Sequence, residues 1–272
     1  MKYGLDIPIS NEFSNPETLV EVAIEAEEAG WDGFFLWDTL SDSKGKNVPF
    51  LDPWIALSAI ASHTHKIKLG LLVTPLARRR PWKVAKELVT LDHLSNGRMI
   101  FGVGLGFAEN DFIPFGETFD PRERAEKLDE GLEIVTKCLT GEKFSFEGKH
   151  YNLQNVQILP KPVQDKIPIW TGGFWPNKKP MRRAARYDGI YLGVVGGEDK
   201  MNPQILTDAI DYISKHRESM DNFDVAIYGN SSIDKNETIS IINSFEGNTW
   251  WIEGNDKPYQ EYRKKIVLGP RY

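Results

Sequence analysis

Glycines and basic residues gather where one apolar segment of the chain ends. The segment Ile169-Trp-Thr-Gly-Gly173 ends in two glycines, and four basic residues follow it (Lys178, Lys179, Arg182 and Arg183). Glycines let backbone N–H groups approach an anion closely, and a helix that begins there adds a favourable dipole. Gly193 and the pair Gly196-Gly197 end the next apolar segment. The pattern predicts a cradle for a single phosphate; the alternative is tight turns beside a solvated basic face.

A second group of polar residues could also bind ligands. Arg78-Arg79-Arg80 follows an apolar run, and guanidinium groups hold carboxylates and phosphates through paired hydrogen bonds. The triplet therefore suits an acidic substrate or a cofactor phosphate, and ion pairs with acidic loop residues are an equal alternative. Asp38 and Glu109 also follow apolar runs. Their spacing does not make them an acid–base pair, so hydrogen-bonding or loop-ordering roles are expected.

Several familiar catalytic patterns are missing from the sequence. The five histidines have no metal-ligand spacing (His63, His65, His93, His150 and His216). There is no G-x-S-x-G elbow and no phosphate loop ending in Gly-Lys-Ser/Thr. Gly102, Gly104 and Gly106 form only part of a dinucleotide-binding fingerprint. Cys138 falls in the apolar register of a helix, so it is expected to be buried.

Apolar segments alternate with amphipathic ones from end to end, which predicts strands and helices in turn. The expected strands are 3–9, 33–38, 67–76, 99–106, 167–173, 189–195, 223–230 and 249–253. The expected helices are 16–30, 52–64, 81–96, 121–140, 177–187, 203–219 and 236–245. The strands are almost continuously apolar, as burial on both faces of a parallel sheet requires.

Helix boundaries agree with this division. Four helices should begin with a capping Asn or Asp followed by proline (Asn15, Asp52, Asp120 and Asn202). Four glycines should close helices (Gly30, Gly97, Gly141 and Gly189). Eight strands separated by helices predict a (β/α)8 TIM barrel, one domain over 1–272, with an insertion around 141–166. In such barrels the chemistry lies at the C-terminal ends of the strands.

Composition limits the function further. The chain has 272 residues, 40% hydrophobic and 26% charged, with a net charge of -6. An acidic balance argues against general binding of nucleic acid or anionic membranes. One cysteine excludes an intrachain disulfide, and no apolar run approaches a membrane span. With no evident signal peptide, a cytoplasmic protein is expected.

Several segments together resemble the luciferase-like monooxygenase family. They include Ala26-Glu-Glu-Ala-Gly-Trp-Asp-Gly-Phe-Phe-Leu-Trp-Asp38, the run from Leu69 to Leu76, the run from Thr90 to Gly106, and Thr249-Trp-Trp-Ile-Glu-Gly254. The family is a (β/α)8 barrel that binds FMN or the F-420 type of deazaflavin at its C-terminal rim. The resemblance implies that strand three ends in a bulge, often with a non-proline cis peptide, supporting one face of the flavin. Leu72, Val73 and Thr74 occupy that place.

The resemblance also implies the other cofactor contacts. Asp38 would hydrogen-bond the ring, and Leu105, Gly106 and Asn110 would line the ring and its ribityl chain. Thr171, Gly172, Gly173 and Gly193 match the phosphate cradle. The expected function is a flavin-dependent oxidoreductase, foremost a monooxygenase that acts on a small organic substrate with reduced FMN. A separate flavin reductase is the partner expected to supply the reduced FMN. Loops 39–51 and 107–120 would cover that substrate.

Two departures from the family keep alternatives open. Many relatives have His where this chain has Thr39, and the sugar-phosphate dehydrogenases have a Glu where it has Phe107. Asp38 is then the nearest candidate for catalytic proton handling, although an orienting role is preferred. A deazaflavin-dependent hydride transferase, a non-catalytic flavin-binding protein and a sugar-phosphate barrel enzyme are the alternatives. The apolar helix segment Trp54-Ile-Ala-Leu-Ser-Ala-Ile-Ala61 predicts a homodimer.

Overall fold

Parallel strands close into a barrel in the computed structural model of the chain, which describes residues 1–42, 47–197, 200–229, 248–254 and 258–270. The barrel strands are β1 (Lys2–Ile7), β2 (Gly33–Leu36), β3 (Lys68–Leu71), β4 (Thr74–Pro75), β5 (Met99–Gly104), β8 (Ile169–Trp175), β9 (Gly189–Val194), β10 (Asp224–Gly229) and β11 (Asn248–Glu253). The order is β3-β2-β1-β11-β10-β9-β8-β5-β4, and pairing of β3 with β5 closes the ring. Because β3 and β4 follow each other along β5, the barrel has eight strand positions, as predicted.

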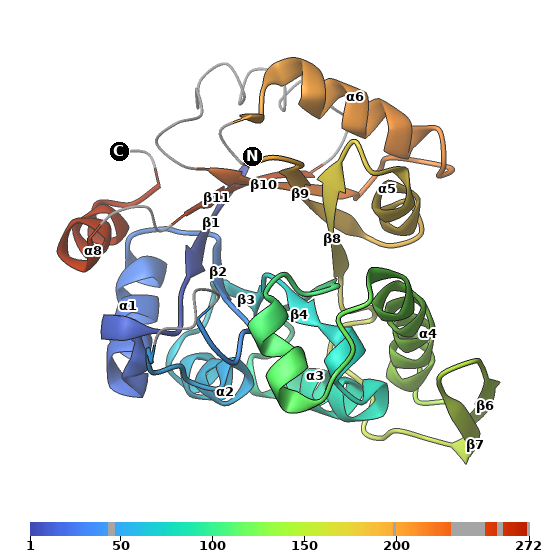
Figure 1. Cartoon of the computed structure of the whole chain (residues 1–272). Helices are drawn as coiled ribbons and strands as arrows, with labels where there is room; N and C mark the ends of the chain where they lie inside the picture. Colours follow the sequence, from blue (N-terminus) through green and yellow to red (C-terminus); the bar gives the residue numbers. More distant parts are fainter. Residues whose placement is uncertain (43–46, 198–199, 230–247, 255–257, 271–272) are drawn as a thin grey trace.

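Helices surround the barrel, as the view into it shows (Figure 1). They are α1 (Pro16–Glu28), α2 (Pro53–His63), α3 (Pro81–Leu94), α4 (Pro121–Leu139), α5 (Lys178–Ala184), α6 (Pro203–Ser214) and α8 (Tyr259–Leu268). The sequence reading missed α8, and its expected helix 236–245 lies outside the described residues. No helix among the described residues has the length and apolar character to cross a membrane.

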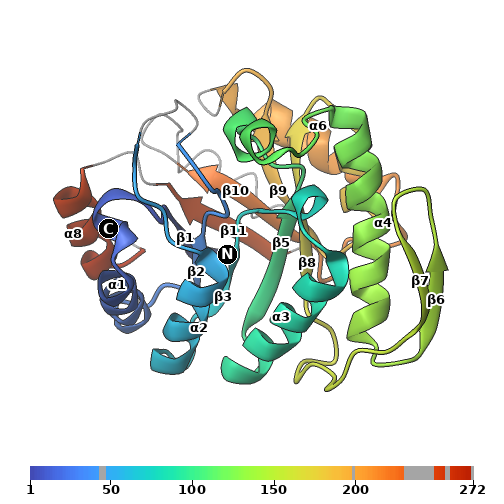
Figure 2. The ribbon, with the colours of Figure 1, turned by 60° about the horizontal axis from the view of Figure 1, so that its bottom comes forward.

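The predicted insertion is a hairpin outside the barrel. Strands β6 (Phe144–Glu147) and β7 (Asn152–Val156) pair with each other in antiparallel fashion. They lie beside α4, on the side away from the barrel strands (Figure 2). The hairpin therefore adds to the outer layer and leaves the closed sheet unchanged.

The predicted helix caps are confirmed. Asn15, Asp52, Asp120 and Asn202 each accept a hydrogen bond from a backbone N–H in the first turn of the following helix, and proline occupies an early helical position. Gly30, Gly97 and Gly141 have positive φ angles, as helix-closing glycines should. The same prediction was wrong for Gly189, which is the first residue of β9. A Cβ there would lie 2.6 Å from Trp170 Cδ1, so glycine is needed for close packing.

Aromatic side chains fill the barrel interior. Phe35, Trp170 and Trp250 pack together there, with the two indole centroids 5.2 Å apart. Asp224, at the N-terminal end of β10, accepts hydrogen bonds from both indoles, at 2.9 Å from Trp170 Nε1 and 3.1 Å from Trp250 Nε1. The interior is therefore filled at this end, so a site within the barrel is expected at the opposite, C-terminal end.

Candidate cofactor and substrate site

A bulge opens the C-terminal end of the barrel, here called the mouth. Gly70 pairs with Ile100 and Thr74 pairs with Val103, so three residues on one strand oppose two on the other. Leu72 and Val73 both face the interior, where they contact the aromatic cluster, and the peptide bond between them is cis. The predicted bulge and cis bond are confirmed.

Glycines surround the Val73 side chain. A Cβ on Gly104 would lie 2.7 Å from Val73 Cγ2, and one on Gly172 would lie 3.3 Å from Val73 Cγ1. Gly193, on the next strand, would bring a Cβ within 2.6 Å of the Phe174 ring. The backbone of these glycines thus borders the half-buried Val73 side chain, which forms an apolar platform at the mouth.

Three of the predicted cofactor residues have their side-chain positions on the outer face of the sheet. Thr74 and Thr171 both pair with Val103, and paired residues of neighbouring strands share a face. Their buried Oγ1 atoms have no hydrogen-bond partner among the described residues. Gly173 faces α5, where a Cβ would lie 2.8 Å from Pro180 Cβ and 2.9 Å from Met181 Cε. These residues reach the mouth only through their backbone.

The basic stretch after β8 is largely engaged within the protein. Arg183 makes a bidentate pair with Asp129, at 2.7 and 3.0 Å. The Lys178 ammonium lies 3.5 Å from the centre of the Trp175 ring and 4.3 Å from that of Tyr212. Arg182 donates to the Tyr212 hydroxyl, while Lys179 is exposed. Of the four predicted basic residues, Lys179 is the one left facing solvent with no contact described.

Asp38 is held by basic residues at the end of β2. Its carboxylate Oδ1 accepts from Arg78 Nη2 at 2.9 Å and from Arg79 Nη2 at 2.7 Å, and Oδ2 accepts from Trp54 Nε1 at 3.3 Å. The Asp38 side chain has no exposed surface, and those of Arg78 and Arg79 are 5% and 17% exposed. For Arg78 and Arg79 the ion-pair alternative is therefore the one observed, with Asp38 as partner rather than the long loop. Arg80 is exposed, and its guanidinium lies 5.8 Å from the centre of the Trp82 ring. Glu109 is also exposed.

A buried carboxylate that the sequence reading missed joins two loops of the mouth. Asp111 accepts from the backbone N–H groups of Leu40 and Ser41, at 2.9 and 3.0 Å, and from the Thr39 hydroxyl at 2.7 Å. Its neighbour Asn110 donates to the Asp42 carbonyl at 3.1 Å. No periodicity marks Asp111 in the sequence, because its partners are about 70 residues away. Asp111 fixes loop 39–42 against the loop that follows β5, which lies at the upper edge of the barrel in Figure 2.

Arg124 holds the backbone just after β5. It donates to the carbonyls of Leu105 and Gly106, at 3.2 and 3.1 Å, and its guanidinium lies over the Phe112 and Phe119 rings. Burial lowers the pKa of this guanidinium. Gly106 has φ +81°, and a Cβ there would lie 2.8 Å from the Phe112 ring. The predicted residues Leu105, Gly106 and Asn110 thus border the mouth on this side.

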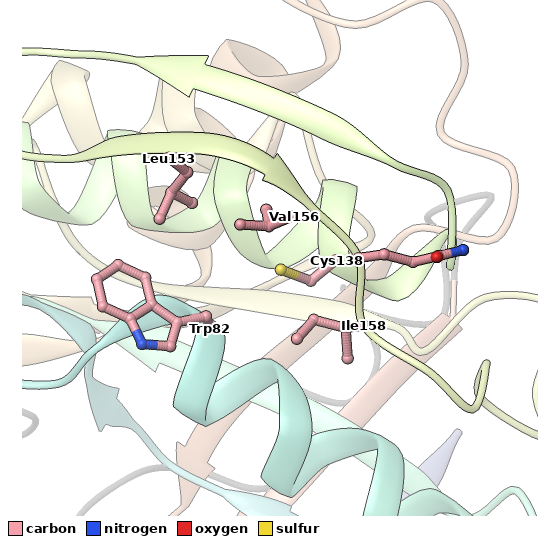
Figure 3. Close-up of a pocket in the computed structure, with 6 residues that line it drawn as sticks. Trp82, Cys138, Leu153, Val156 and Ile158 are labelled. Carbon is pink, nitrogen blue, oxygen red and sulfur yellow. The ribbon is translucent and has the colours of Figure 1, made fainter.

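A separate cavity lies outside the barrel, under the β6–β7 hairpin. Its volume is about 330 Å³, and its lining is almost wholly apolar (Trp82, Cys138, Leu153, Val156, Gln157 and Ile158; Figure 3). Cys138 is buried, as predicted, and burial raises its pKa to about 11. The thiol is therefore protonated at neutral pH, and the cavity offers no charged group for catalysis.

Comparison with known proteins identifies the family. The profile of the luciferase-like monooxygenase family matches residues 4–239. The chain belongs to this family. It is 31% identical, over 74% of its length, to the F420-dependent glucose-6-phosphate dehydrogenase of Microbacterium testaceum (strain StLB037). It is 30% identical, over 83% of its length, to the enzyme of the same name from Nakamurella multipartita. The chain spans 60% and 66% of the lengths of these two relatives.

Solved structures agree with the luciferase-like fold. The structure of an F420-dependent secondary alcohol dehydrogenase in complex with an F420-acetone adduct superimposes with a TM-score of 0.78, at 18% identity. The superposition covers 98% of this chain and 96% of that one. The TIM-barrel prediction is therefore confirmed for this luciferase-like chain.

Proposed function

We propose that the chain is an oxidoreductase that transfers a hydride between a deazaflavin of the F420 type and a small organic substrate. The F420-dependent enzymes among its relatives support this function over the reduced-FMN monooxygenase favoured from the sequence. Hydride transfer to or from a deazaflavin needs no separate flavin reductase. That partner belongs to the FMN alternative.

The open mouth suits a planar ring. Val73 offers an apolar platform, and Gly104 and Gly172 leave free the space that a Cβ would fill beside it. Leu105, Gly106 and Asn110 border the platform on one side. The bound deazaflavin would supply the carbon that accepts or donates the hydride, while the barrel orients it and excludes water. Backbone groups of Thr171, Gly172, Gly173 and Gly193, with exposed Lys179 nearby, would hold its phosphate.

For Asp38 we propose an orienting role. Its carboxylate already has three donors, two of them charged, so it is a poor acceptor for a substrate proton. Asp38 instead fixes Arg78 and Arg79 and the backbone at the end of β2, which borders the mouth. The proton that accompanies hydride transfer would then pass to or from water.

Cofactor titration tests the proposal. Purified chain is titrated with F420 and, separately, with FMN, and binding is followed by quenching of cofactor fluorescence. We expect F420 to bind at least about tenfold more tightly, a difference of about 1.4 kcal/mol. Tighter binding of FMN, with oxygen consumed when reduced FMN is added, would overturn the proposal in favour of the monooxygenase.

We also propose that the chain forms a homodimer through α2. Trp54, Leu57 and Ile60 are buried within the subunit, but Ile55 on the same helix is 73% exposed. An exposed branched side chain near the small, incompletely buried residues Ser58, Ala59 and Ser62 of the same helix suits a close helix contact. Sedimentation at micromolar concentration should give about twice 31.0 kDa, and a particle of 31.0 kDa would contradict the dimer.

A further inference from the structure

We propose, on the basis of the proposed function, that Tyr228 and Asp6 form the relay that moves the proton accompanying hydride transfer. Both side chains face the barrel interior at the mouth. Asp6 pairs with Phe35, which belongs to the interior aromatic cluster, and paired residues of neighbouring strands share a face. Tyr228 follows Ala226, a member of the same cluster, by two residues of β10, so it also points inward.

The Tyr228 hydroxyl reaches toward Asp6. A Cβ on Gly254 would lie 2.1 Å from Tyr228 Cζ and 2.2 Å from its hydroxyl oxygen, so the end of the phenol occupies the space over Gly254. Leu5 pairs with Glu253 in the parallel ladder of β1 and β11. The next residues of the two strands, Asp6 and Gly254, are therefore neighbours. Adjacent strands lie about 5 Å apart, a distance that the Asp6 side chain can span.

This pair lies across the mouth from the Val73 platform. In the ring of eight strand positions, β10 is four positions from the bulge between β3 and β4, which is half of the circumference. The view into the barrel shows β10 and β11 on the side opposite β3 and β4 (Figure 1). A planar cofactor ring that rests on Val73 thus turns its other face, where a substrate would bind, toward Tyr228.

The other buried carboxylates described at the mouth point away from its interior. The Asp38 carboxylate is directed to the arginines that follow β4, and Asp111 is directed to the loop after β2. Glu253 is as buried as Asp6, each being 4% exposed, but it lies on the outer face of the sheet and pairs with Lys265. Among the described residues, Asp6 is thus the buried carboxylate that is aimed into the mouth.

The described surroundings of Asp6 offer one ionisable side chain. The inward positions at the ends of the two neighbouring strands, β2 and β11, are uncharged (Phe35, Trp37, Ile252 and Gly254). From the outer layer, the Tyr262 hydroxyl of α8 donates to the carbonyls of Asp6 and Glu253, at 3.4 and 3.1 Å, and so fixes the ends of both strands. Within the described part of the chain, Tyr228 is therefore the ionisable group that faces the Asp6 carboxyl.

The relay balances the reaction in either direction. When a substrate hydroxyl-bearing carbon is oxidised, its C–H bond breaks and the hydride passes with both electrons to the oxidised deazaflavin. The substrate O–H proton passes to the Tyr228 oxygen, the Tyr228 proton passes to the Asp6 carboxylate, and a C=O bond forms. Water then takes the proton from Asp6. Reduction with the reduced coenzyme follows the same steps in reverse.

A titration without cofactor tests the pairing. NMR follows the Tyr228 resonance, identified by its loss in Tyr228→Phe, in chain that carries tyrosine isotopically labelled at Cζ. We expect this resonance to shift as the Asp6 carboxyl loses its proton, because the new charge acts on the adjacent phenol. Asp6→Asn should remove the shift, and the matched control Glu253→Gln, equally buried on the outer face, should keep it. A shift that survives in Asp6→Asn, or no shift at all, would overturn the relay.

Kinetics of the loaded chain test proton transfer itself. Chain saturated with F420 is assayed across pH with propan-2-ol, cyclohexanol and glucose 6-phosphate. We expect kcat to fall about a hundredfold in Asp6→Asn and in Tyr228→Phe, with F420 affinity changed by less than about twofold. Oxidation should slow as pH falls and Asp6 is protonated, and Asp6→Asn should lose this dependence. The double variant should be no slower than either single variant, because both groups serve one proton.

The outcomes separate the relay from the function on which it rests. Failure of F420 to bind, or of the loaded chain to oxidise any of the three substrates, overturns the proposed function. Turnover that Asp6→Asn and Tyr228→Phe leave unchanged, or losses that multiply in the double variant, overturn the relay alone.

Discussion

The Val73 side chain occupies the space that a Cβ on Gly104 would need, with Val73 Cγ2 only 2.7 Å from that position. Two residues from adjacent barrel strands thus share one volume at the mouth. Val73 can pack this closely against β5 because residue 104 has no side chain. The cofactor platform that we propose depends on this pair.

Gly104→Ala should therefore push Val73 toward the opening. We expect a loss of about 1–3 kcal/mol in the free energy of unfolding, from overpacking, and weaker F420 binding. Gly172→Ala, where the nearest Val73 atom would be 3.3 Å away, should have a smaller effect. Adding Val73→Ala to Gly104→Ala should restore stability. Urea unfolding and F420 titration measure both quantities, and equal effects at the two glycines would argue against the Val73 contact.

Asp38→Asn should separate an orienting role from proton transfer. The change leaves two largely buried guanidinium groups without their carboxylate, so the free energy of unfolding should fall by about 3 kcal/mol. F420 affinity should fall as the end of β2 loosens, while the pH profile of the hydride-transfer step stays in place. Stopped-flow rates across pH provide the measurement. Normal affinity combined with lost turnover would instead make Asp38 the proton carrier.

Asp111→Ala should release loop 39–42 from the loop after β5. Two backbone N–H groups and one hydroxyl lose a charged acceptor, which should cost about 2 kcal/mol of stability. Hydrogen exchange at the Leu40 and Ser41 amides should accelerate strongly. Glu109→Ala removes an exposed carboxylate two residues away and serves as the control. Unchanged exchange at both amides in Asp111→Ala would show that Asp111 does not hold the two loops together.

Asp224 should make stability depend on pH. Burial raises its pKa above the ordinary 3.8, despite the two indole hydrogen bonds, so the folded chain holds this proton more tightly than the unfolded chain. The contribution is fully present below the unfolded pKa and is lost as pH rises through the folded pKa. The stability advantage over Asp224→Asn should thus shrink with rising pH. Urea unfolding measured at several pH values, with Asp221→Asn as an exposed control, checks the slope; a constant difference would contradict it.

Cys138 should resist alkylation in the native state. With a pKa of about 11, only about one thiol in a thousand is ionised at pH 8, and burial blocks access. Iodoacetamide should leave the folded chain unmodified and label it rapidly in urea, as mass spectrometry can follow. Cys138→Ala, which should show no labelling in either state, is the control. Fast labelling of folded chain would mean that the cavity under the hairpin opens readily.

Local chemistry allowed most of the architecture to be predicted from the sequence. Continuous apolar runs located the barrel strands, and Asn or Asp before proline located four helix starts, because capping needs only neighbouring atoms. The bulge at Leu72 and Val73 followed from the family resemblance. The helix α8 was missed because its apolar residues do not form a continuous stripe: Tyr262 and Ile266 are buried, whereas the adjacent Val267 and Leu268 are exposed.

Tertiary structure decided what each polar residue of the mouth does. Gly172 and Gly173 are neighbours in sequence, yet one faces Val73 and the other faces α5, because alternate residues of a strand point to opposite faces. From the sequence alone, Arg78 and Arg79 were candidates to bind a ligand. In the closed barrel Asp38 lies beside them and accepts their hydrogen bonds. Asp111 gained its role only when two loops 70 residues apart met. Such partners are distant along the chain, so spacing alone carries no signal of them.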